Sequence, residues 1–431
     1  MESETGTVVI EVAYGEGWDL AARALVRPLS REAALARDGA GLPYAVALRI
    51  PGREAPLEVR LVSWRDHYAG VWVYDAEGRR THHLDLRLLD GDRLLHRLTR
   101  HWEYADAGTP EFDDGCARTT LELFPDGRGS LERHRPGPGG GTLVTTPDLA
   151  EEERWLARPA FGGWPLFSAE AAQAAVPENA SFREAEVEPG AGVEPREEWH
   201  PPRPGGYGDR GALFQPGTRL ATRHHPEMTV LEPDRSLQIR IPGGVLAVDA
   251  PDNGDGPAFT IPVPPGTYPL ETARLSYGYD CEFRGRWVTT TDLPAVRLRL
   301  SDAPPVRWEM ALGEDHDPRL LPDGGAYGFD TDSATGCFAD GAAWEPLKRL
   351  YARALFENDE TAGEDLSGNR DSMFLMRTSD EATGADLMAF ATGGDGTYAV
   401  WLGRAASGDL ACVDIQVGYL QDLRVLSDPR P

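Results

Sequence analysis

Short runs in which apolar and polar residues alternate, separated by turns that contain glycine, recur along most of the chain and restrict it to antiparallel β structure. Two examples are LEVRLVSW, residues 57–64, and TTLELFPDGRGSLERH, residues 119–134. In the second run, Leu121, Leu123 and Leu131 share one face, because successive side chains of a strand point to opposite sides. The PDGRG centre supplies a hairpin turn, since glycine tolerates the positive φ of tight turns. The pattern predicts a mainly β protein.

Changes in composition divide the chain into two β domains and the segments that join them. Residues 1–147 carry the alternating pattern, and residues 148–182 contain capping signals that indicate a short helical connector. Residues 183–211 are rich in Pro, Gly and Glu, and they predict a linker because they hold few aliphatic side chains to bury. Residues 212–431 resume the alternation, with one packed helix near 346–357. We therefore expect two antiparallel β-sheet domains, sandwich or barrel-like, with a few short helices.

Two helices are predicted from their end signals and their spacing. In SREAALARDG, Ser30 can cap the start of a helix and Gly39 can end it. In EPLKRLYARALFEN, Leu347, Tyr351 and Leu355 recur every four residues and mark one apolar face. We expect that face to pack on the sheet of the second domain.

The charge of the chain argues against some classes of partner. Its formal net charge is −27, whereas nucleic acids and anionic membranes bind basic surfaces. The segments 313–340 and 357–386 are rich in carboxylates and are predicted as loops, so together they favour a basic protein as partner. The alternative is that both loops are simply solvated and that the charge serves solubility.

The sequence also predicts the compartment. The N-terminus MESETGTVVIEV lacks the basic segment and the long apolar run of a secretion signal, and no apolar run approaches the roughly 20 residues of a membrane helix. We therefore expect a cytoplasmic protein. Cys116, Cys281, Cys337 and Cys412 are far apart, which predicts reduced, buried thiols. No cofactor is expected, because no G-x-S-x-G, P-loop, H-E-x-x-H or dinucleotide-binding pattern occurs.

The stretch GFDTDSATGCFADG, residues 328–341, has the densest chemistry of the chain. Asp330, Asp332 and Asp340 are weak candidates for a Ca²⁺ or Mg²⁺ site, since two carboxylates two residues apart on a strand point to the same side. Their spacing does not match an EF-hand loop. Cys337 is a weak candidate nucleophile, because nearby aspartates raise the pKa of a thiol. The alternative is an acidic turn.

Four stretches of the C-terminal part resemble, in order, the motifs of a bacterial domain family of unknown function that is common in actinobacteria. They are PPGTYPL, AVRLRLSDAPPVRWEMAL, YGFDTDSATGCFADGAA and ATGGDGTYAVWLGRAASGDL. The family patterns are G-x-Y-P, V-R-W-E-x-A, D-x-G-T-G-C-F-x-D and G-D-G-x-Y-x-V-x-x-G. The resemblance covers about residues 212–431 and implies no settled activity. The chain departs from the patterns at Ala334, which replaces a glycine, and at Ala399, where proline is frequent.

Polar residues of these motifs form the candidate site. Glu309 lies in RWEMA, which is predicted as a buried strand, so its carboxylate needs a partner such as Arg307 or Arg297. We hypothesise that four carboxylates converge in one pocket, with a thiol and a tyrosine hydroxyl beside them. The proposed set is Glu309, Asp332, Cys337, Asp340, Asp395 and Tyr398. The alternative is a set of interlocked turns.

These observations favour a non-catalytic, acidic, cytoplasmic binding protein, with an immunity or inhibitor protein against a basic toxin as one form of it. One alternative is an enzyme, or a small-molecule or metal site, built on the carboxylates of the C-terminal domain. Another is a structural component of a larger assembly. The sequence indicates neither a nucleic acid nor a membrane as partner.

Overall fold

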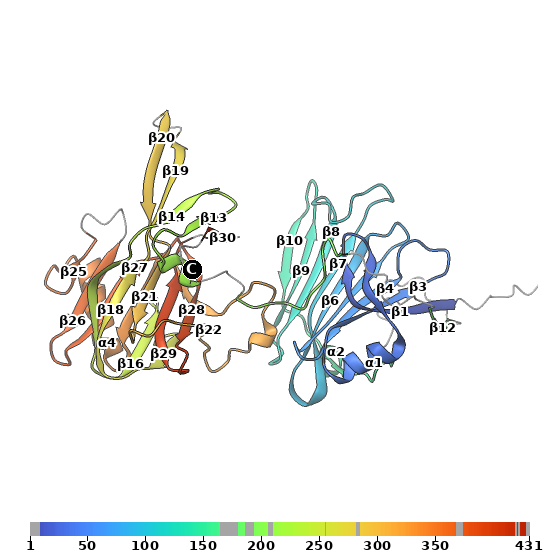
Figure 1. The fold of residues 1–431 in the computed structure, drawn as a ribbon, viewed down its shortest axis with the longest axis horizontal. Helices are drawn as coiled ribbons and strands as arrows, with labels where there is room; N and C mark the ends of the chain where they lie inside the picture. Colours follow the sequence, from blue (N-terminus) through green and yellow to red (C-terminus); the bar gives the residue numbers. More distant parts are fainter. Residues whose placement is uncertain are drawn as a thin grey trace, which may run out of the picture. The chain divides into compact units, whose positions relative to one another are not determined.

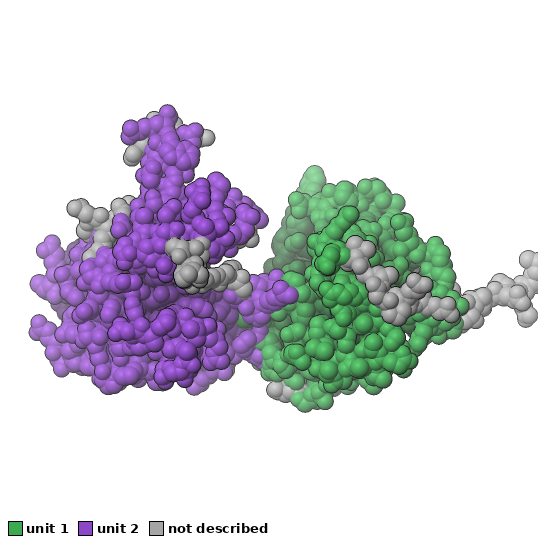
Figure 2. All heavy atoms as spheres, viewed as in Figure 1, with its two compact units in different colours: residues 1–202, 319–322 green, residues 203–318, 323–431 purple. Residues whose placement is uncertain are grey.

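The computed structural model describes residues 9–163, 180–185, 194–205, 210–254, 256–281, 285–367, 374–418, 420 and 423–427. They form two compact units, coloured separately in Figure 2. The N-terminal unit comprises residues 1–202 together with the short segment 319–322. The C-terminal unit comprises residues 203–318 and 323–431. None of the described helices is both long and apolar enough to cross a bilayer.

The N-terminal unit is built on one sheet, with the order β10-β9-β8-β7-β6-β5-β4-β3-β1-β12 (Figure 1). β2 also pairs with β1, and β11 pairs with β7. Consecutive strands are antiparallel neighbours, as the alternating sequence predicts, whereas β12 pairs in parallel with β1. The strands are β1 (Val9–Asp19), β2 (Ala24–Leu29), β3 (Tyr44–Arg49), β4 (Glu58–Ser63), β5 (Tyr68–Tyr74), β6 (Arg80–Leu88), β7 (Arg93–Glu103), β8 (Ala117–Leu123), β9 (Gly129–Arg135), β10 (Gly141–Thr145), β11 (Trp155–Ala157) and β12 (Ser181–Glu184).

The central strands of this sheet are buried on both faces. One face packs Tyr44, Val71 and Leu86 with Ala34 of helix α1 (Arg31–Gly39). The other face carries an aromatic cluster, with Trp18, Tyr68, Trp72 and Trp199 among its members. The predicted first helix is confirmed, and the Ser30 hydroxyl accepts a hydrogen bond from the Ala33 N–H at 3.2 Å.

The segments between the predicted domains are only partly helical. In the predicted connector 148–182, the described elements are a short helix α2 (Glu151–Arg154), strand β11 and strand β12. The remainder of the predicted helical connector, residues 164–179, falls outside the described residues. In the predicted linker 183–211, Trp199 is 8% exposed and its backbone N–H donates to the carbonyl of Trp18 at 2.8 Å. An aromatic side chain and backbone hydrogen bonds therefore order a segment that lacks aliphatic residues.

A short segment from the second half of the sequence, residues 319–322, completes the N-terminal unit. Leu320 packs against Leu89 and Leu95. Arg87 donates to the carbonyl oxygens of residues 319 and 321 at 2.7 and 3.0 Å, and Arg97 donates to that of Leu320 at 3.1 Å. The sequence predicts this segment as part of the second domain, because composition does not reveal which surface a four-residue stretch contacts.

The described residues of the C-terminal unit form three sheets. Their strand orders are β20-β19-β14-β13-β30, β15-β18-β21-β29-β28-β22 with β23 on β28, and β17-β16-β24-β27-β26-β25. All described pairings within it are antiparallel. The strands are β13 (Arg219–Ala221), β14 (Met228–Val230), β15 (Asp234–Ile241), β16 (Val245–Asp249), β17 (Phe259–Pro262), β18 (Gly266–Thr272), β19 (Leu275–Cys281), β20 (Arg286–Asp292), β21 (Ala295–Arg299), β22 (Arg307–Met310), β23 (Gly328–Thr331), β24 (Thr335–Asp340), β25 (Glu364–Asp365), β26 (Leu375–Asp380), β27 (Ala385–Ala391), β28 (Gly396–Arg404), β29 (Leu410–Gln416) and β30 (Arg424–Ser427).

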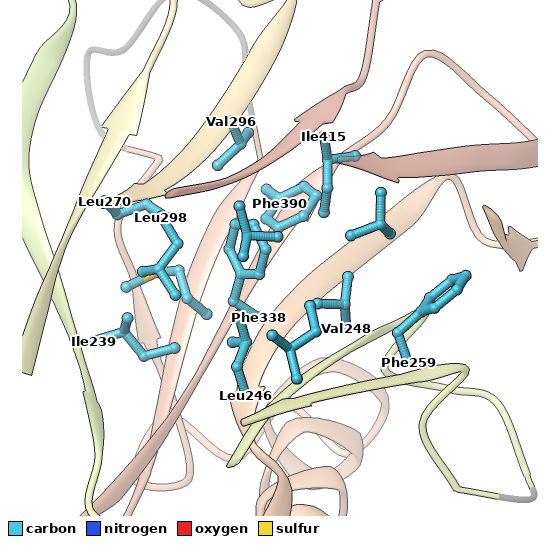
Figure 3. Packing of buried hydrophobic residues seen from close by; sticks show 14 of the residues in the cluster. Ile239, Leu246, Val248, Phe259, Leu270, Val296, Leu298, Phe338, Phe390 and Ile415 are labelled. Carbon is cyan, nitrogen blue, oxygen red and sulfur yellow. The ribbon is translucent and has the colours of Figure 1, made fainter. Parts of the chain in front are cut away.

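The main core of this unit lies between the seven-stranded and the six-stranded sheet. Figure 3 shows Phe338 and Phe390 side by side in its middle, with their ring centroids 5.4 Å apart. Helix α4 (Trp344–Phe356), the predicted amphipathic helix, packs Leu347 and Tyr351 on the other face of the six-stranded sheet. The mainly β, antiparallel fold class is therefore confirmed. In the described part of the chain the sheets are open, with no closed barrel.

Candidate functional site

The structure brings two of the six predicted site residues together. Asp395 and Tyr398 both line a pocket of 260 Å³ at the start of β28. The Tyr398 hydroxyl donates to the carbonyl oxygen of Gly394 at 2.9 Å, and its ring stacks on Phe329 at 5.8 Å. Asp395 is exposed at the mouth of the pocket. The two residues therefore share a site, with the tyrosine fixed and the carboxylate facing solvent.

Glu309 lies on β22, which ends its sheet and is paired on one side only by β28. Its side chain is 36% exposed, because an edge strand is covered less than the buried strand that the sequence predicted. The carboxylate forms ion pairs with Arg307 at 2.6 Å and with Arg404 at 3.0 Å. Arg307 was an expected partner, whereas Arg297 pairs with Asp414 instead. Glu309 does not line the pocket of Asp395.

The aspartates of the stretch 328–341 are distributed around a turn and its two strands. Asp332 is exposed in the turn between β23 and β24. Asp330 accepts a hydrogen bond from the Thr397 hydroxyl. Asp340 is 1% exposed and accepts from the backbone N–H groups of Gly243 and Ala342 at 2.5 and 2.8 Å. Among the described residues, no three His, Cys, Asp or Glu side chains are grouped so that they could hold a metal ion.

The glycine-rich part of this stretch builds the core. A Cβ atom at Gly336 would lie 2.6 Å from the ring of Phe329 and 2.9 Å from that of Phe390, so only glycine fits there without displacing both rings. Phe338, two residues on, is fully buried between the two sheets. In this part of the motif the residues serve strand packing.

Ala334 has a φ of 52°, a left-handed conformation that a glycine would adopt without strain. We expect Ala334→Gly to raise the free energy of unfolding of the C-terminal unit by about 0.5–1 kcal/mol, because it relieves a left-handed backbone at an alanine. Urea unfolding followed by hydrogen exchange in β24 measures this. Ala339→Gly, in the middle of the same strand, is the control and should destabilise. An Ala334→Gly variant as unstable as the control contradicts the prediction.

Cys337 is fully buried on β24, under helix α4. Burial raises the pKa of its thiol well above the ordinary value, and the nearby carboxylate of Asp249 raises that pKa further. Cys116 and Cys412 are also buried, free thiols, and burial raises their pKa values as well. Thiols of this kind are poor nucleophiles, since the thiolate is the reactive form.

We expect the thiols of Cys116, Cys337 and Cys412 not to react with an aromatic disulfide reagent at pH 8 in the folded protein. A Cys281→Ser variant isolates them, because the side chain of Cys281 lies outside the described residues. All three should react after unfolding in guanidinium chloride. A fast-reacting thiol in the folded variant would show that one of the three is accessible.

Two pockets adjoin in the C-terminal unit and share Gly418 and Leu420 in their linings. The first, here the Tyr277 pocket, has a volume of 370 Å³ and lies between the five-stranded sheet and the ends of β27 and β29. Tyr277 donates to the exposed carboxylate of Asp292 at 2.6 Å, and its ring lies 4.3 Å from that of His225. This pocket combines an aromatic wall with a carboxylate that faces solvent.

The second pocket, here the Trp401 pocket, is the one that holds Asp395 and Tyr398. Arg210, from the 3₁₀ turn Arg210–Phe214, lies over the Trp401 ring at 3.4 Å from its centroid. Arg210 is 6% exposed and donates to the carbonyl of Gly205 at 3.2 Å. The Arg210 guanidinium is therefore buried in the pocket wall. Of the two charged side chains in the described lining, Asp395 is the one exposed to solvent.

Sequence reasoning did not find Tyr277, Asp292, Arg210 and Trp401 as site residues. Tyr277 and Asp292 read as ordinary positions of a strand pair, and they come together because β19 and β20 are in register across Leu275 and Asp292. Figure 1 shows that these two strands form a long hairpin that projects from its unit. The pockets arise where separate sheets meet, and a one-dimensional pattern carries no signal for that.

Residues 239–415 match the model of a family described as a protein of unknown function (DUF4241). The match covers less than half of the chain and includes Asp292, Asp395, Tyr398 and Trp401. It leaves out Arg210, His225 and the shared edge at Gly418 and Leu420. None of the curated proteins matches the chain. The C-terminal region is therefore similar to a family of unknown function, and both pockets lie partly inside the matched residues.

Proposed function

We propose that the chain is a non-catalytic, acidic, cytoplasmic binding protein and that its partner is a basic protein, such as a toxin that it holds inactive. The observation that carries the proposal is the pair of adjoining pockets in the C-terminal unit. Each has an aromatic wall and one exposed carboxylate, Asp292 in the Tyr277 pocket and Asp395 in the Trp401 pocket. Aromatic rings and carboxylates together suit the side chains of lysine and arginine.

The charge of the surrounding surface supports the same partner. In the segment 357–386, Glu357, Glu360 and Glu381 are exposed. The guanidinium group of Arg377 is already paired with Glu364. Helix α4 likewise contributes Arg353, which pairs with Asp359. The excess carboxylates therefore set a negative potential that speeds the approach of a basic partner at low salt.

Binding of a labelled nona-arginine peptide to the full chain, followed by fluorescence anisotropy, tests the proposal. The Asp292→Asn/Asp395→Asn double variant should weaken binding about tenfold at low salt, the loss expected from two charge pairs of about 0.7 kcal/mol each. Glu357→Gln/Glu381→Gln is the matched control, because it removes the same charge outside the pockets. Affinity should fall steeply between about 20 and 300 mM salt.

Equal losses in the double variant and its control would show that charge alone attracts the peptide, which removes the pockets from the proposal. Absence of any salt-dependent binding would overturn the proposal altogether. In the natural setting, a basic protein captured at low salt should be released by the pocket variant and retained by the control.

A small cationic ligand is a second candidate, favoured by the pocket volumes of 370 and 260 Å³, which are near the lower end for small-molecule sites. Spermidine is a suitable probe. If it is the better occupant, it should raise the unfolding temperature at a concentration that leaves nona-arginine binding unsaturated, and Asp292→Asn should remove that shift.

A further inference from the structure

The N-terminal unit contains a groove with the opposite electrostatic character. It has a volume of 410 Å³ and lies on the face of β6, β7, β8 and β9 beside the segment 319–322. Four arginines from three neighbouring strands line it, namely Arg87, Arg97, Arg100 and Arg118. This is a local gathering of cations in a chain with a net charge of −27.

The carboxylates of the groove leave one arginine in excess. Asp85 pairs with Arg87 at 2.8 Å between Oδ2 and Nη2, and Glu122 pairs with Arg97 at 2.7 Å. Glu132 is the partner of Arg118, at 3.6 Å. The remaining arginine of the lining, Arg100, is exposed and has no ion pair among the described residues.

Two of the arginines already bind acceptor oxygens of a chain segment. Arg87 and Arg97 together contact the backbone carbonyls of residues 319, 320 and 321. Arg97 is 7% exposed, and its Nη1 has no hydrogen-bond partner. That atom is shielded from solvent and the charge of Arg97 is paired with Glu122, so Arg97 belongs to the wall of the groove. The groove is thus lined by arginines and by the carboxylates that pair with three of them, and Arg100 and Arg118 are its exposed arginines.

Arg100 and Arg118 lie on the same face of adjacent strands. Arg100 is paired in register with Thr120, and Trp102 is paired with Arg118. Since side chains two residues apart point to one face, both guanidinium groups flank Trp102 and Thr120. An arginine is suited to bidentate binding of a planar or tetrahedral oxyanion, and a hydroxyl and an indole complete such a site.

We propose that this groove binds an oxyanion-bearing ligand, a carboxylate or a phosphate, beside the segment 319–322, with Arg100 and Arg118 as its contacts. The binding is independent of the acidic pockets of the C-terminal unit and rests on other residues. The segment 319–322 stays in place, because its carbonyls occupy Arg87 and Arg97 and leave the open end free.

Isothermal titration of the full chain at low salt tests this with two probes, sodium pyrophosphate and a tetraglutamate peptide. Saturable binding of one or both is expected, and Arg100→Gln should weaken it at least tenfold. Arg100→Lys should keep part of the affinity, because it keeps the charge and loses the bidentate geometry. The probe that binds tells whether the ligand is a phosphate or an acidic peptide.

Arg133→Gln is the matched control, because Arg133 is an exposed arginine on β9 that alternates with the groove residue Glu132 and points to the other face. Its affinity should stay within twofold of the original. Saturable binding of neither probe would overturn the proposal, as would equal weakening by Arg133→Gln and Arg100→Gln.

Discussion

Replacing Asp414 with alanine is expected to lower the free energy of unfolding of the C-terminal unit by about 3–5 kcal/mol, the usual cost of breaking a buried ion pair on one side. Asp414 is 4% exposed and accepts two hydrogen bonds from Arg297, both at 2.8 Å. Burial raises the pKa of its carboxyl group, against the opposing effect of the Arg297 charge. Without Asp414, Arg297 keeps a distant partner in Glu271 at 3.8 Å and loses both short bonds.

Hydrogen exchange of the full chain in urea, read in β21 and β29, measures this change in the unit concerned. The double variant Arg297→Met/Asp414→Leu is the control, because it removes both charges and fills similar volume. It should recover most of the loss. An Asp414→Ala variant that loses less than about 1 kcal/mol would show that water reaches the Arg297–Asp414 pair, contrary to its burial in the structure.

The N-terminal unit is expected to lose stability as the pH falls from about 6.5 to 4, because of buried histidines. Burial lowers the pKa of His82 to about 4, and the neighbouring His101 lowers it further. Their rings stack at 4.1 Å. Burial likewise lowers the pKa of His83 to about 4, although Asp85 acts in the opposite direction. Arg80, Arg87 and Arg100 also disfavour the charged His83 ring, which stacks on Trp72.

Stability falls with falling pH because the unfolded state binds protons more readily than the folded state. A histidine with a lowered pKa in the folded state binds protons first in the unfolded state, so the stability it confers is present above pH 6.5 and is lost toward pH 4. For His82, which is 7% exposed, the full loss is on the order of 3 kcal/mol. Exchange rates in β6 and β7 between pH 7 and 4.5 measure it.

His82→Gln should remove its own part of this pH dependence and leave the part that comes from His83. The control is His134→Gln. His134 lies on β9 and shares a hydrogen bond with the hydroxyl of Thr142 near the surface. That variant should keep the original slope. An N-terminal unit equally stable at pH 7 and 4.5 would contradict the placement of His82 and His83.

Local patterns were enough to predict the strands and the amphipathic helix, because alternation and helical spacing act within a few residues of each other. Ser30 and the face of Leu347 and Tyr351 are examples. Features that depend on distant contacts were not predictable. Trp199 orders a segment whose composition indicates a linker, and Glu309 lies on an edge strand because of where β22 falls in its sheet.

The candidate site was predictable only at Asp395 and Tyr398, which are close in sequence and share a pocket. Asp340 and Cys337 belong to the same motif stretch, but β24 buries both beneath its neighbours, where they hold backbone groups and pack against α4. A glycine-rich, acidic motif has the same sequence whether it forms turns or a ligand site. The difference lies in which carboxylates reach solvent, and that depends on the packing of whole sheets.

The short segment 319–322 has a consequence for the order in which the chain acquires its structure during synthesis. The ribosome delivers residues 1–202 well before residue 322, so the carbonyl partners of Arg87 and Arg97 and the apolar partner of Leu95 arrive late. The N-terminal unit can therefore gain its final contacts only after much of the C-terminal sequence has emerged. A fragment cut at residue 202 would lack those contacts permanently. Complete folding of the N-terminal unit therefore requires residues 319–322, which are synthesised more than 100 residues later.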